Sequence, residues 1–129
     1  MRTPTHDEVI QAAAEIVDAY AATDGGRYFS LFAPSATFLF HTEPRRLDDR
    51  AAYERLWDSW IGEGWRVVSC VSSDPLVQLR PGFAVFTHTV DTTVATEGGE
   101  ESFRERETIV FAVEDAQLVA VHEHLSPLS

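Results

Sequence analysis

"VAVHEHLSPLS", residues 119–129, carries the pattern on which the fold prediction depends. Apolar and polar residues alternate along it, which is typical of a β-strand with one buried face. In a regular strand, successive side chains point to opposite faces. We therefore expect His122 and His124 to share one face with Ala120, and Glu123 to lie on the other.

The chain upstream of this strand predicts the rest of a sheet. Its second half is rich in Val, Thr and Phe, which favour strands. "EGGE" (97–100) and "EDA" (114–116) are typical of turns between neighbouring strands. The expected strands are residues 36–43, 65–73, 75–79, 83–96, 102–113 and 117–125.

Helices precede most of these strands. Thr5 and Glu8 form the pattern of a capping box, and apolar residues follow it at helical spacing. Asp48 or Asp49 is expected to cap the third helix. The three expected helices cover residues 9–21, 27–32 and 52–61. Helices that cover one face of a sheet give an α+β fold, here a single domain over residues 1–129.

The charge and the cysteine content exclude several classes of protein. The formal net charge is −11, and all ten basic residues are arginine. This balance disfavours nucleic acids and anionic membranes as partners. Without lysine there is no Schiff-base chemistry. The single cysteine, Cys70, excludes an intrachain disulfide and a thiolate-cluster metal site. With no long apolar segment and no signal peptide, we expect a cytoplasmic protein.

Two stretches carry a family resemblance. "YFSLFAPSATFLF" (28–40) and "VHEHLS" (121–126) resemble the nuclear transport factor 2-like superfamily, in its SnoaL-like and ketosteroid isomerase-like branch. The last strand also resembles the association domain of calcium/calmodulin-dependent kinase II. The resemblance implies a cone-shaped, curved antiparallel sheet wrapped around helices, as in cystatin-like folds. It also implies a pocket in the open end and a homodimer through the outer face of the sheet.

The isomerase chemistry itself does not carry over to this chain. Alignment through "LFA" and "AT" places the catalytic aspartate of ketosteroid isomerase-like proteins on Phe40. The tyrosine donor falls near Glu15, and the second aspartate falls near Glu107 or Thr108. Neither the base nor the tyrosine donor is retained, so a steroid isomerase mechanism is not expected. Proton transfer by other residues stays open.

Histidines are the best candidates for catalytic residues in this sequence. His122 and His124, with His88 on a neighbouring strand, are suited to acid–base chemistry near neutral pH. The same pair could bind zinc with His88 or Glu107 as a third ligand. It could also serve only as hydrogen-bonding groups at the mouth of the cone. We favour the last role over the other two and predict no metal.

The resemblance also implies a set of ligand-binding side chains. Three aromatic residues form a stripe on the third helix, and others follow the strands; pockets are usually lined in this way, although core packing is the alternative. One inward arginine could hold a carboxylate, although a solvated ladder of ion pairs is the alternative. The predicted ligand-binding residues are Tyr20, Phe38, Phe40, Tyr53, Trp57, Trp60, Phe86, Arg106 and Glu107.

Together these features predict a cofactor-independent enzyme. It would act on a small hydrophobic substrate as an isomerase, cyclase, dehydratase or hydrolase. Its partner would be a small hydrophobic or carboxylate ligand, and neither nucleic acid nor membrane is expected. The alternatives are a non-catalytic ligand-binding module and an oligomerisation domain.

Overall fold

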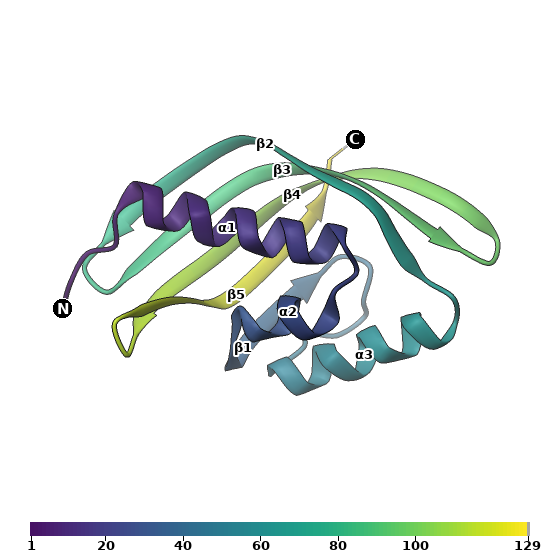
Figure 1. Cartoon of the computed structure of the whole chain (residues 1–129), viewed down its shortest axis with the longest axis horizontal. Coiled ribbons are helices and arrows are strands. Elements are labelled where there is room, and N and C mark those ends of the chain that lie inside the picture. Colours follow the sequence, from purple (N-terminus) through teal and green to yellow (C-terminus); the bar gives the residue numbers. More distant parts are fainter. Residues whose placement is uncertain (129) are drawn as a thin grey trace.

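Three helices and five strands make up the computed structural model, which describes residues 1–128 (Figure 1). The helices are α1 (His6–Ala21), α2 (Gly25–Ser30) and α3 (Arg50–Gly62). The strands are β1 (Phe32–Phe40), β2 (Arg66–Arg80), β3 (Phe83–Thr96), β4 (Gly99–Glu114) and β5 (Gln117–Pro127). This order confirms the predicted α+β class.

The five strands form one sheet in the order β1-β5-β4-β3-β2. The pairs β2–β3, β3–β4 and β4–β5 are antiparallel, as predicted. β1 instead pairs in parallel with β5, so the sheet is mixed rather than wholly antiparallel. The reason is the long connection through α3 and the meander, which returns β5 alongside β1 in the same direction.

The two strands predicted for residues 65–73 and 75–79 are one strand, β2. Its pairing with β3 continues on both sides of an irregularity between Ser73 and Leu76. Asp74 lies there with a φ of 53°, a left-handed conformation. A bulge therefore bends this edge strand without ending it.

The helices begin at caps that the sequence indicates. The Thr5 hydroxyl accepts from the Glu8 N–H, and the Glu8 carboxylate accepts from the Thr5 N–H. Asp49 caps α3 by accepting a backbone N–H of the first turn at 2.8 Å. α2 begins earlier than predicted because the carboxylate of Asp24 caps it by accepting from the Arg27 N–H.

The sheet curves over the helices, with α1 along β2 and α3 against β1 (Figure 1). The core lies between these two layers and contains fully buried aromatic and aliphatic side chains, among them Tyr28, Phe32, Phe38, Ile109 and Phe111. Within residues 1–128, no helix combines the length and apolar character that crossing a bilayer requires.

Candidate functional site

A β-bulge in β5 decides which side chains reach the interior. Ala120 pairs with Phe111 of β4, and His122 pairs with Val110, so Val121 is an extra residue between the two pairs. A bulge of this kind breaks the alternation of faces along a strand. The regular alternation predicted for this strand is therefore wrong beyond Ala120.

Glu123 faces the interior in place of the two histidines. It pairs with the core residue Ile109, and only 2% of Glu123 is exposed. The His122 ring is hydrogen-bonded through Nδ1 to Oγ1 of Thr37 at 2.8 Å, and His124 is exposed. The prediction that His122 and His124 face the cavity is wrong, because the bulge leaves both on the outer side of the sheet.

The histidine pair also does not assemble with the third zinc ligands considered above. The ring centroids of His122 and His124 lie 6.3 Å apart. Across residues 1–128, no three His, Cys, Asp or Glu side chains are grouped so that they could hold a metal ion. Burial, assisted by the neighbouring His124, lowers the pKa of His122, which favours the neutral ring.

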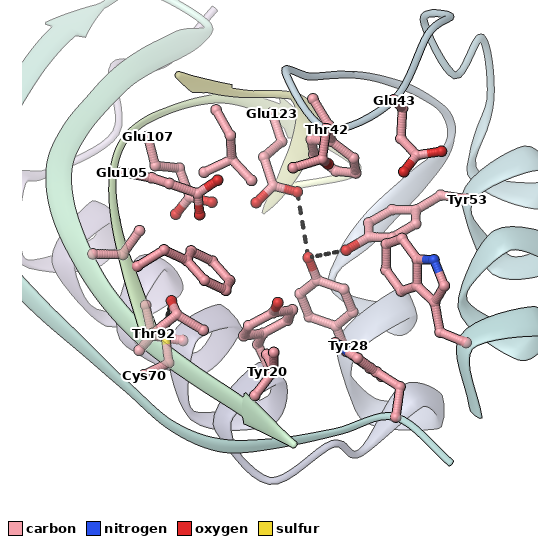
Figure 2. A pocket seen from close by; sticks show the side chains of 18 of the residues that line it. Tyr20, Tyr28, Thr42, Glu43, Tyr53, Cys70, Thr92, Glu105, Glu107 and Glu123 are labelled. Carbon is pink, nitrogen blue, oxygen red and sulfur yellow. Dashed lines mark hydrogen bonds between the residues drawn. The ribbon is translucent and has the colours of Figure 1, made fainter. Parts of the chain in front are cut away.

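A cavity of about 270 Å³ opens between the helices and the inner face of the sheet. Aromatic rings form much of its wall, namely Tyr20, Tyr28, Phe40, Tyr53, Trp60, Trp65 and Phe103. The strands contribute carboxyl groups, among them those of Glu105, Glu107 and Glu123. These carboxyl groups and the hydroxyl group of Tyr28 point into a common space (Figure 2). Such an apolar cavity with a few convergent polar groups is typical of small-molecule sites.

Three glutamates supply the acidic side of this cavity. Glu105 and Glu107 lie two residues apart on β4 and therefore share a face, and both are less than a tenth exposed. Glu105 Oε2 lies 2.5 Å from Nε2 of His41. The carboxyl group of Glu107 lies close enough to that of Glu123 on the neighbouring strand for each to shift the pKa of the other. Burying carboxylates side by side favours retention of a proton between them.

The pKa values of this carboxyl pair move accordingly. Burial raises the pKa of Glu107, and the neighbouring charge of Glu105 adds to the effect. Burial, together with the adjacent carboxylate of Glu107, raises the pKa of Glu123 well above its usual range. The two carboxyl groups therefore titrate as a coupled pair, which retains a proton to higher pH than an isolated glutamate does.

Two buried tyrosines extend the polar network from the carboxyl pair. The Tyr28 hydroxyl donates to Oε1 of Glu123 at 3.3 Å and lies 3.1 Å from the Tyr53 hydroxyl (Figure 2). Because the Tyr28 proton is engaged with Glu123, the Tyr53 hydroxyl donates to Tyr28. Burial raises the pKa of both phenols, so both are donors at neutral pH.

His88 lies behind the carboxyl pair and does not line the cavity. Its side chain is fully buried on the inner face of β3. Nε2 lies 2.6 Å from Oε1 of Glu107, and Nδ1 lies 2.6 Å from Oγ of Ser72. Burial lowers the pKa of His88 to about 4, which leaves the ring neutral at physiological pH.

The structure separates the predicted ligand-binding residues into two groups. Those that line the cavity are Tyr20, Phe40, Tyr53, Trp60 and Glu107. Those that do not are Phe38, Trp57, Phe86 and Arg106. The three aromatic residues of this second group belong to the packed core. Arg106 is exposed, since its strand neighbours Glu105 and Glu107 take the inner face.

Three cavity-lining residues of the polar network were not predicted as site residues. Glu105 has a visible signal, because it shares a strand face with the apolar Ile109 and Phe111. Tyr28 lies in a short helix that the sequence indicates, but nothing local shows that its hydroxyl reaches Glu123. Glu123 itself has no local signal, because only the bulge in β5 turns it inward.

The sequence was compared with models of known protein families. A family model described as a SnoaL-like domain matches residues 9–129. The chain belongs to the SnoaL-like domain family. This confirms the resemblance to the nuclear transport factor 2-like superfamily that the sequence indicates. A comparison with curated proteins gave no match.

Solved structures similar to this SnoaL-like domain share its fold. A nuclear transport factor 2-like superfamily protein from Salmonella enterica has a TM-score of 0.83 at 15% identity, covering 95% of this chain and 90% of that one. A similar protein from Cytophaga hutchinsonii has a TM-score of 0.83 at 11% identity, covering 97% and 99%. A protein from Xanthomonas campestris, assigned as a calcium/calmodulin-dependent protein kinase II association domain, has a TM-score of 0.77 at 18% identity, covering 97% and 89%. At these identities the likeness shows the fold alone.

Proposed function

We propose that this SnoaL-like domain is a cofactor-independent enzyme that transfers a proton on a small hydrophobic substrate. The observation that carries the proposal is the buried Glu107–Glu123 pair, with Tyr28 hydrogen-bonded to it, at the wall of an apolar cavity. A retained proton beside an ionised carboxylate supplies an acid and a base within one site.

The proposed step begins when a substrate carbonyl oxygen accepts the Glu123 proton in a hydrogen bond. Glu107 loses that donor and acts as the carboxylate base through Oε2, while its Oε1 stays hydrogen-bonded to Nε2 of His88. It takes a proton from the carbon next to the carbonyl, and Glu123 stabilises the developing enolate with its O–H. Glu107 then returns the proton to the same or another carbon. No electrons are gained or lost, so no cofactor is needed.

The charge of the cavity favours a neutral substrate. The described residues that line it include five glutamates and no arginine. Because an anion would meet like charges without a cationic partner, the carboxylate ligand considered above is the poorer match. The ring-lined wall instead suits an apolar body of one or two rings.

Deuterium exchange tests the proposed step without requiring the natural substrate. We would follow the hydrogens next to the carbonyl of 1-tetralone by NMR in deuterated buffer. The expected result is exchange above the buffer rate, reduced about 10²- to 10⁴-fold in Glu107→Gln. Exchange should survive in the matched control His122→Ala/His124→Ala, whose changes lie outside the cavity.

Two outcomes would overturn the proposal. One is exchange that persists in both Glu107→Gln and Glu123→Gln. The other is saturable binding of 1-tetralone with no exchange, which would identify the non-catalytic ligand-binding module instead. Assembly into a homodimer through the outer face of the sheet stays a prediction.

A further inference from the structure

Two consecutive hydrogen bonds through the ring of His88 link an exposed serine to the buried carboxyl pair. Ser72 is exposed on the edge strand β2, and its Oγ lies 2.6 Å from Nδ1 of His88. Nε2 of the same ring lies 2.6 Å from Oε1 of Glu107. Both imidazole nitrogens are therefore engaged, one with a hydroxyl group and one with a carboxyl group.

The chemistry of these groups determines which atom donates and which accepts in each of the two hydrogen bonds. When Glu107 is the ionised member of the pair, its carboxylate only accepts, and Nε2 of His88 carries the hydrogen between them. In a neutral ring Nδ1 is then an acceptor, and the Ser72 hydroxyl is the donor beside it. Burial lowers the pKa of His88 to about 4, in agreement with a neutral ring.

We propose that His88 is the positioning residue of the carboxyl pair. Ser72 holds the imidazole as the Nε2–H tautomer, and that N–H donates to Glu107. A donor directed at one member favours its ionised form, so the shared proton resides on Glu123. This inference rests on the proposed function, since it decides which carboxyl of the same pair is the base and which is the acid.

Other titratable groups face this network and bear on any measurement of it. They are Tyr20 from α1, Tyr28 from α2, Tyr53 from α3, Cys70 from β2, Glu105 from β4 and His41 beyond β1. The test must therefore observe His88, Glu107 and Glu123 individually instead of following a single global titration.

NMR of the substrate-free protein provides that resolution. Nitrogen-15 shifts report the tautomer of His88, and side-chain carbonyl carbon-13 shifts report the ionisation of Glu107 and Glu123. In the wild type, we expect His88 to carry one hydrogen, on Nε2, throughout pH 5–8. We expect Glu107 to ionise at lower pH than Glu123.

Substitutions then separate positioning from packing. His88→Leu removes the donor, and the titration of Glu107 should move upward by about one pH unit. His88→Gln retains an N–H donor and should restore the wild-type titration to within a few tenths of a unit. Ser72→Ala should allow the Nδ1–H tautomer to appear. His124→Ala, an exposed histidine outside the cavity, should change none of these.

Three results would overturn the inference. They are a wild-type His88 that carries its hydrogen on Nδ1 at pH 7, a tautomer unaffected by Ser72→Ala, and a Glu107 titration unchanged in folded His88→Leu. The first two do not depend on the folding of a His88 variant. Because no substrate is present, these outcomes are independent of the exchange assay, so failure of the proposed enzyme activity can be told apart from failure of this inference.

Discussion

Glu107 and Glu123 lie diagonally across the β4–β5 ladder: Glu123 pairs with Ile109, two residues from Glu107 on the same face. Diagonal neighbours of this kind are within reach of long side chains. Both carboxyl groups are buried, and each shifts the pKa of the other. The cavity chemistry follows from this pair, since two carboxyl groups brought together out of water cannot both ionise readily.

The pair makes folding stability depend on pH. The pKa of Glu123 is higher in the folded protein than in the unfolded chain. At a pH between these two values, the folded protein therefore holds more protons than the unfolded chain does. The free energy of unfolding therefore falls as pH increases above the unfolded carboxyl value of about 4.5. Glu123→Gln keeps a donor toward Glu107 but cannot ionise. Between pH 5 and pH 8, its free energy of unfolding should therefore fall by at least about 1 kcal/mol less than that of the wild type. Urea unfolding at both pH values measures this.

Exposed Glu100 provides the matched control for that experiment. Glu100→Gln removes the same charge from the protein without touching the pair. A pH dependence that is equal in Glu100→Gln and Glu123→Gln would mean that net charge, and not the buried pair, sets the slope.

The two tyrosines should differ in their contribution to stability. Tyr28→Phe leaves Glu123 without a donor and Tyr53 without a partner, which should cost about 1–3 kcal/mol. Tyr53→Phe removes only the donor to Tyr28, which still donates to Glu123, and should cost about 0.5–1.5 kcal/mol. Denaturant unfolding at pH 7 compares them. Equal or reversed costs would contradict the direction assigned to this network.

His88 should make the protein sensitive to acid. The pKa of His88 is about 4 in the folded protein, below the usual 6.5. Between these two pH values the unfolded chain therefore binds a proton at His88 and the folded protein does not. The neutral His88 contributes about 2–3 kcal/mol to the free energy of unfolding above pH 6.5. This contribution is lost as pH falls toward 4. His88→Gln should lack this loss when unfolding is measured at pH 7.5 and pH 4.5.

The control here is His124→Gln, because His124 is an exposed histidine. It should follow the wild-type pH dependence. If His88→Gln also loses stability between these pH values as the wild type does, the acid sensitivity has another origin.

Cys70 offers a probe of the cavity that needs no mutation. It lines the cavity and is the only cysteine in the sequence, so alkylation has one product. Burial raises the pKa of its thiol from about 9 to about 11. At pH 8 iodoacetamide should react at least about 100-fold more slowly than with a free thiol, because the thiolate is the nucleophile. Mass spectrometry measures the rate.

Addition of 1-tetralone extends this experiment. A molecule held in the cavity covers Cys70 and should slow alkylation further. A rate equal to that of glutathione, with or without 1-tetralone, would contradict the buried position of this thiol.

Much of the architecture could be predicted from local sequence signals. The capping box at Thr5 and Glu8 and the helical spacing after it predict α1. The alternation in β4 places Glu105 and Glu107 on the face of Ile109 and Phe111, which is where the structure has them. These features depend on neighbours only a few residues apart, and side-chain periodicity reports such neighbours directly.

Only the tertiary structure decided the composition of the site. The bulge at Val121 arises where β5 pairs with β4 and with β1 on its two edges, and it turns Glu123 inward and both histidines outward. Tyr28 reaches Glu123 across 95 residues of sequence. The alternation of apolar and polar residues along the sequence does not reveal such long-range pairing. A single extra residue in a strand reverses the face to which every later side chain points.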